Sequence, residues 1–130
     1  MRNVFAQVKL LWLFLKKIKD MLFEQLEKSA GEIQFNDVIS FIDAHYDFMP
    51  TKFTNGNTVN EAGQNNGSCK VFSFAKLNAL SKEETLALFG DFYRTDVLQN
   101  PEGNDHQNIR NFMVFGWDGI LFEGEALKRK

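Results

Sequence analysis

The sequence predicts an α+β fold, a mainly helical single domain with a short two-stranded β element. The chain has 130 residues, a length typical of one domain. Phenylalanine is unusually frequent, with 14 Phe beside 2 Trp and 2 Tyr, and its large ring without a polar group favours burial in a core. Apolar residues recur at helical spacing in several segments, whereas only two short segments resemble strands.

The first two helices of the body are predicted from turn signals and spacing. Asn36 is a favourable N-cap for a helix over about 36–47, which Pro50 ends. Residues 69–79 fit either a strand or a helix capped by Ser68. Their Ala, Leu and Lys content favours the helix.

Two further helices follow. Ser81 and Glu84 form a capping box, from which we predict a helix that continues to about residue 98. Gly90 lies inside this helix, where it costs about 1 kcal/mol relative to alanine, so we expect a close helix contact there. Asp105 is the expected N-cap of the last helix, and Gly116 suits its C-terminal end.

The β element is predicted from two short segments that flank turn signals. A strand near residues 52–54 precedes the turn Asn55-Gly56, and residues 120–122 follow the turn Asp118-Gly119. We expect the two strands to pair. Two short strands are marginal alone, so the helices must support them.

Residues 1–20 differ in charge from the rest of the chain, and we treat them as a helical N-terminal extension of a domain over 21–130. They hold five basic residues and one acidic residue, a net charge of +4, whereas residues 21–130 carry −6. The uncharged run over residues 10–15 is far shorter than the roughly 20 residues of a membrane span, and no signal-peptide cleavage site follows it. Three interpretations stay open: docking on the domain or on a second copy, contact with an anionic membrane surface, or an upstream extension with translation starting at Met21.

Composition excludes several classes of function. The acidic body lacks the clustered Lys and Arg of a nonspecific nucleic-acid binder. The single cysteine, Cys69, excludes an internal disulfide and a cysteine-based zinc site. His45 and His106 are too few for a recognisable metal motif, so we predict neither a metal nor a cofactor.

The first polar stretch, residues 60–70, is a candidate ligand site. Gly67-Ser68 before a helix leaves free amides that attract an anion, although the spacing of the glycines is not that of a Walker A loop. The alternative is that the polar side chains pair with the backbone of an irregular loop. The candidate ligand-binding residues are Asn60, Glu61, Gln64, Asn65, Ser68 and Lys70.

The second polar stretch, residues 105–110, adds Asp105, Asn108 and Arg110 to the candidate ligand-binding residues. His106 and Arg110 are four residues apart and share a helix face. This face suits a carboxylate or phosphate, but we favour its pairing with Glu61 inside the domain.

A catalytic alternative uses Cys69 as nucleophile and His106 as base, with Asp105 or Glu61 orienting the imidazole. Such a thiol needs a lowered pKa, which a helix N-terminus helps to provide. A single cysteine is more often a small buried hydrophobe. Trp117 is either a lid on this region or, as we favour, a plug in the core.

Several unusual motifs carry a family resemblance. They are residues 53–57 (FTNGN), 60–65 (NEAGQN), 67–70 (GSCK), 93–94 (YR), 101–103 (PEG), 105–113 (DHQNIRNFM) and 116–117 (GW). Over about residues 21–127 the chain resembles the HopJ type III effector family. The resemblance implies a bacterial protein delivered into a host cell by a type III secretion system, and it implies no established enzymatic activity and no catalytic residue set.

We therefore predict a binding or interaction domain of undefined biochemical activity, whose partner is an unknown protein or small-molecule ligand. The alternative is a small hydrolase or transferase that uses Cys69 and His106. Residues 1–20 contain no serine and the whole chain contains five, whereas export signals tend to be serine-rich, so we favour the cytoplasm over export. All site predictions require the two polar stretches to lie side by side over a phenylalanine-filled core.

Overall fold

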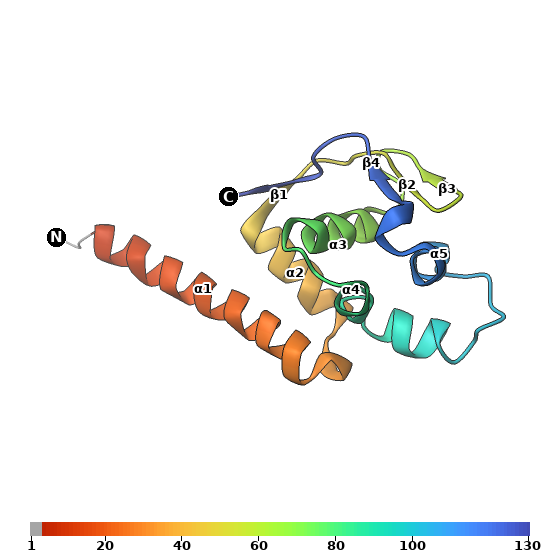
Figure 1. Ribbon diagram of the computed structural model, residues 1–130. Helices are drawn as coiled ribbons and strands as arrows, with labels where there is room; N and C mark the ends of the chain where they lie inside the picture. The colour runs from red at the N-terminus through yellow and green to blue at the C-terminus, as the bar shows by residue number, and fades with distance from the viewer. Residues whose placement is uncertain (1–3) are drawn as a thin grey trace.

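The computed structural model describes residues 4–130, so the first three residues of the predicted extension lie outside it. Helix α1 (Val4–Lys28) is followed by the short 3-10 helix η1 (Ala30–Glu32). The first half of α1 projects away from the rest of the molecule (Figure 1). Its second half packs on the core through Leu22 and Leu26, and the helix continues without a break across residues 20 and 21.

Helix α2 (Phe35–His45) lies where a helix over 36–47 was predicted. The predicted N-cap Asn36 is wrong, because the helix begins one residue earlier, after Gln34, which makes no side-chain cap. The helix also ends before Pro50, since strand β1 (Tyr46–Phe48) pairs with β5 (Leu127–Arg129) in a two-stranded antiparallel sheet.

The predicted β element is the centre of a second, three-stranded sheet. Strand β2 (Phe53–Asn55) pairs with β4 (Ile120–Phe122), as expected, and also with β3 (Thr58–Asn60) across the turn at Gly56. The fold class is confirmed, but residues 4–130 form five short strands where two were expected. Strands β1, β3 and β5 were not predicted, because three residues are too few for the alternation of a strand to be recognised.

Helix α3 (Asn66–Leu77) settles the ambiguity over residues 69–79 in favour of a helix, although it begins before the proposed cap Ser68. Helix α4 (Lys82–Ala87) starts with the predicted capping box. The Glu84 amide donates to Ser81 Oγ at 3.1 Å, and the Ser81 amide donates to Glu84 Oε1 at 2.9 Å.

The prediction of one helix to residue 98 is wrong, because α4 ends at Ala87 and the backbone turns at Gly90. This glycine has a φ of +60°, and an added Cβ would lie 2.8 Å from the Phe35 amide nitrogen. The following residues form a π-helix, η2 (Phe92–Val97). The expected close contact at Gly90 is therefore real, but it is made with the backbone before α2 and ends the helix.

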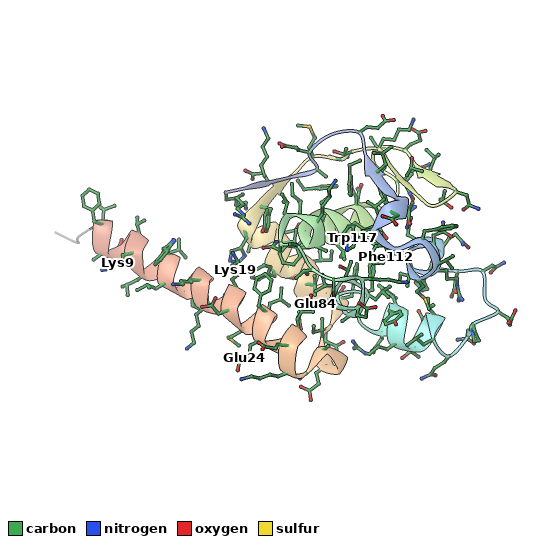
Figure 2. The ribbon with its side chains drawn as sticks, viewed as in Figure 1. Lys9, Lys19, Glu24, Glu84, Phe112 and Trp117 are labelled. Carbon is green, nitrogen blue, oxygen red and sulfur yellow. The ribbon has the colours of Figure 1, made fainter. Side chains whose placement is uncertain are left out.

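Helix α5 (Gln107–Phe115) and the 3-10 helix η3 (Gly116–Gly119) complete the fold. The cap of α5 is His106 rather than the predicted Asp105. Trp117 is partly buried and packs on the core: its Nε1 donates to the Leu80 carbonyl at 3.0 Å, and its ring meets Phe112 edge-on. Figure 2 labels the two residues next to each other. The fully buried rings of the core are Phe53, Phe72, Phe74 and Phe112.

Candidate functional site

The two predicted polar stretches meet through Asn60. Its Oδ1 accepts hydrogen bonds from Asn65 Nδ2 at 2.7 Å and from Asn108 Nδ2 at 2.9 Å. Its own Nδ2 donates to Asn108 Oδ1 at 3.2 Å. Asn60 is 1% exposed and Asn108 is 7% exposed, so these are buried polar bonds that join segments 48 residues apart.

The amide network continues to β2 and to the middle of α5. Asn55 Nδ2 donates to the Asn108 carbonyl and to Asn108 Oδ1, at 2.8 and 3.0 Å. Asn111 Nδ2 donates to the Asn55 carbonyl at 3.0 Å and to Thr58 Oγ1 at 2.9 Å. The network therefore fixes α5 against the β2–β3 hairpin without any charged group.

Two helices begin at this network with the same unusual backbone. Asn65 precedes α3 and His106 precedes α5, with φ of 53° and 49°. Neither side chain caps its own helix. Asn65 instead binds Asn60, while His106 Nε2 lies 3.0 Å from Asp96 Oδ2 in η2. The first turns of both helices thus keep amide groups that no side-chain cap satisfies.

A pocket of about 340 Å³ lies between these two helix starts. One side of it is aromatic, with rings from α2, the segment after α4 and η2, and the other side is polar. None of its lining residues is a Lys, Arg, Asp or Glu, so the pocket suits a ligand with little net charge. Its lining residues are Phe35, Thr58, Asn65, Gly67, Ser68, Phe89, Phe92, His106, Gln107, Asn108 and Ile109.

Several predicted site residues lie outside this pocket and have structural partners. Gln64 Oε1 accepts from the Glu61 amide at 3.0 Å, which closes the loop before α3. The Glu61 carboxylate lies 3.8 Å from Lys52 Nζ, so the expected pairing of Glu61 with the His106–Arg110 face is wrong. Lys70 turns the other way, to Asp43 Oδ1 at 2.8 Å.

Asp105 and Arg110 brace the loop before α5. Arg110 Nη2 donates to Asp105 Oδ1 at 2.6 Å, and Arg110 Nη1 donates to the Asn100 carbonyl at 2.9 Å. The Arg110 hydrogen bond lowers the pKa of the Asp105 carboxyl. The guanidinium has its donors committed to the protein, so its role in this structure is to shape the loop that carries His106.

Cys69 and His106 have separate surroundings. Cys69 is 2% exposed, and its Sγ donates to the Thr51 carbonyl at 3.6 Å. Burial raises the pKa of the thiol, whereas a nucleophilic cysteine needs a lowered pKa. His106 instead contacts Asp96 and packs against the Phe92 ring, with centroids 5.0 Å apart. The two residues of the catalytic hypothesis share no contact.

One comparison with known proteins identifies a family. The model of the HopJ type III effector protein family matches residues 19–127. The chain belongs to the HopJ family. A crystal structure described as "unknown function protein VPA0580" is 58% identical, covers 85% of this chain and 92% of its own chain, and superposes with a TM-score of 0.84. No curated protein matches the chain significantly.

Within this HopJ domain, sequence reasoning missed the aromatic side of the pocket. Phe35, Phe89 and Phe92 come from segments far from either polar stretch, and at helical spacing they resemble core residues. Phe92 is nevertheless 39% exposed, at the rim. Thr58 was missed because strand β3 was not expected.

The part of the HopJ chain that the structure describes has neither a metal-binding cluster nor a membrane-spanning helix. Residues 4–130 contain no group of three or more His, Cys, Asp or Glu arranged to hold a metal ion. No helix within the same range has the length and apolar character needed to cross a membrane.

Proposed function

We propose that this HopJ domain acts by binding a small ligand in the pocket between the starts of α3 and α5. The observation that carries the proposal is the pocket itself, where two polar stretches distant in sequence meet opposite three phenylalanine rings. Sites for small ligands are typically concave, largely apolar and equipped with a few fixed polar groups.

The lining defines the class of ligand. The rings of Phe35, Phe89 and Phe92 favour a flat, apolar part. The amide groups at the first turns of α3 and α5 favour a hydrogen-bond acceptor, such as a carboxylate or a carbonyl oxygen. Because no lining residue is a lysine or arginine, a polyphosphate has no matching charge here. A ring compound with one carboxylate or amide group fits best.

A titration followed by amide NMR tests the proposal. The probes are benzoate, indole-3-acetate and benzamide, and we expect shifts of the Gly67, Ser68 and Gln107 amides. Ser68→Leu fills the pocket, and Ser40→Leu on the exposed face of α2 is the matched control. Binding should disappear in the first variant and persist in the second. Shifts that scatter over the surface, or that survive Ser68→Leu, refute the site.

The enzymatic alternative with Cys69 and His106 has a separate test. Cys69→Ala and His106→Gln should leave any hydrolase or transferase activity of the purified protein unchanged, because the two side chains lie in separate surroundings. Loss of an activity in both variants would restore the enzyme hypothesis and refute a pure binding role.

The family description favours a second function, delivery into a host cell through a type III secretion system. We propose residence in the bacterial cytoplasm as the alternative. A secretion assay of the full chain, and of the chain begun at Met21, distinguishes the two. Export of either form that depends on the secretion system would establish the effector role and refute the cytoplasmic one.

A further inference from the structure

The projecting half of α1 carries a large exposed apolar surface. Figure 2 shows its side chains extending into solvent beyond the domain, whereas Leu22 and Leu26 in the second half are each 7% exposed. Helices of soluble domains normally bury such residues. The exposed fractions are Val4 66%, Phe5 87%, Val8 60%, Leu10 66%, Leu11 58%, Trp12 58%, Leu13 45% and Phe14 59%.

The same half of α1 is strongly basic. Between residues 4 and 19 there are four lysines, Lys9, Lys16, Lys17 and Lys19, and no acidic residue. Within residues 4–130 none of these lysines forms an ion pair with a carboxylate. Lys16 and Lys19 lie over the rings of Trp12 and Phe23 instead. Their charges are therefore not neutralised by this chain.

The C-terminal strand adds further cations beside the helix. A groove of about 380 Å³ runs between α1, α2 and β5, with Trp12, Phe41 and Tyr46 among its aromatic lining. Its charged lining consists of Lys16, Lys19, Arg129 and Lys130, and no Asp or Glu lines it. An apolar helix thus adjoins a groove that attracts anions.

We propose that the projecting half of α1 and this basic groove dock the protein on an anionic phospholipid membrane surface. A helix that lies in the interface buries its apolar side among the acyl chains and places its lysines among anionic headgroups. Headgroup phosphates would meet the cations of the groove, and Trp12, which lines it, belongs to the residue type that favours the headgroup level.

The distribution of side chains around the helix favours a membrane over a second copy. At 100° per residue seven of the eight exposed apolar positions lie within an arc of about 220°, from Leu10 through Val4 to Phe5, and Leu13 lies outside it. A partner helix covers a stripe of roughly 100° and would leave much of this arc in water. Two such helices side by side would also bring eight unpaired lysines together, since each copy holds four between residues 4 and 19.

Vesicle co-sedimentation with the full chain tests the proposal. The vesicles consist of phosphatidylcholine with or without phosphatidylglycerol. We expect binding only to the anionic vesicles, reduced by added salt. Lys16→Glu with Lys17→Glu should weaken it at least about tenfold, since each lysine near the surface contributes about 1 kcal/mol. Leu10→Ser with Phe14→Ser should abolish it.

Two control variants match these changes elsewhere on the surface. Lys76→Glu with Lys82→Glu changes the net charge by the same amount as the α1 variant. Val114→Ser with Leu121→Ser removes two exposed apolar side chains, from α5 and β4. Both should bind vesicles as the unaltered chain does. Circular dichroism checks that all four variants fold.

Quenching by brominated phospholipid gives an independent readout. Trp12 should be quenched on anionic vesicles and Trp117, which is partly buried against the core away from α1, should not, so that Trp12→Phe removes the effect. Equal loss of binding in the control variants would overturn the proposal. So would a dimer in light scattering that Leu10→Ser with Phe14→Ser dissociates while no vesicle binding occurs, because that result assigns the surface to a second copy.

Discussion

Removal of the Asn108 side chain tests the buried amide network that joins the two polar stretches. Asn108→Ala deletes three hydrogen bonds: its Oδ1 accepts from Asn55 and Asn60, and its Nδ2 donates to Asn60. The two partners are not orphaned. Asn55 Nδ2 keeps the Asn108 carbonyl at 2.8 Å, and Asn60 Oδ1 keeps Asn65 at 2.7 Å. Asn60 Nδ2 keeps the Phe53 carbonyl at 3.4 Å. The loss therefore consists of the bonds themselves.

The expected magnitude follows from these contacts. A typical hydrogen bond contributes about 1 kcal/mol to stability, so the three bonds amount to about 3 kcal/mol. Alanine has the better helix propensity at this position in α5, which returns about 0.5 kcal/mol. We expect a net decrease of about 2.5 kcal/mol in the free energy of unfolding. For a chain of this length that corresponds to a fall in Tm of about 9 °C.

Urea denaturation monitored by circular dichroism measures this decrease. Asn104→Ala is the matched control, because Asn104 is exposed and lies just before α5. Its effect should stay within about 0.5 kcal/mol. Asn108→Asp keeps the Oδ1 acceptor but places a buried charge 2.9 Å from Asn60 Oδ1, so it should be worse than alanine at neutral pH. If Asn108→Ala matches Asn104→Ala, or Asn108→Asp is the more stable of the two, the network does not hold α5 in place.

Three further predictions concern other parts of the fold. Gly90→Ala should destabilise by at least about 2 kcal/mol in the same denaturation assay, because it combines a positive φ with a Cβ 2.8 Å from the Phe35 amide; a smaller effect would show that the break after α4 relaxes easily. The Cys69 thiol should resist Ellman's reagent in the native state and react at once in urea, because burial both hides it and raises its pKa; rapid labelling of the native protein would contradict its place in the core. Asp105→Asn should lower Tm at neutral pH. Because the folded-state pKa of Asp105 is lowered, this difference should be present above the unfolded pKa and vanish as the pH falls through the folded value, and a difference that persists in acid would exclude the Arg110 pair as its cause.

Much of the fold follows from local signals in the sequence. The Ser81 capping box works through residues three apart, so its geometry depends on little else. The pairing of residues 53–55 with 120–122 was predicted because each segment adjoins a turn. These elements could be predicted because their causes are short-range.

Other features depend on contacts that are distant in sequence. Gly90 itself indicated a close contact, but no pattern near residue 90 revealed its positive φ or that the partner is the backbone of residues 33–35. The left-handed conformations of Asn65 and His106 displaced the expected helix starts, because each side chain binds a distant partner rather than capping its own helix. Propensity alone places such residues at a cap without choosing which position they occupy.

The candidate site could be predicted only in part, because it too depends on contacts between residues distant in sequence. The sequence predicted that residues 60–70 and 105–110 carry the polar chemistry, and the structure joins them through Asn60 and Asn108. The sequence did not show that Glu61 would pair with Lys52, or that Arg110 would bind the loop before α5. Nor did it separate pocket phenylalanines such as Phe92 from core phenylalanines such as Phe72, since both recur at helical spacing.

The two proposed surfaces lie at opposite ends of the molecule, and their charges differ. Figure 1 shows the projecting part of α1 on one side and α5 with β3 on the other. The basic groove lies beside α1, whereas the pocket, which no Lys, Arg, Asp or Glu lines, lies at the starts of α3 and α5. Because residues 21–130 carry a net charge of −6, an anionic membrane that attracts α1 repels the rest of the domain. A docked chain would therefore hold its pocket toward the solution, and the ligand shifts of the Ser68 amide should be the same with and without vesicles.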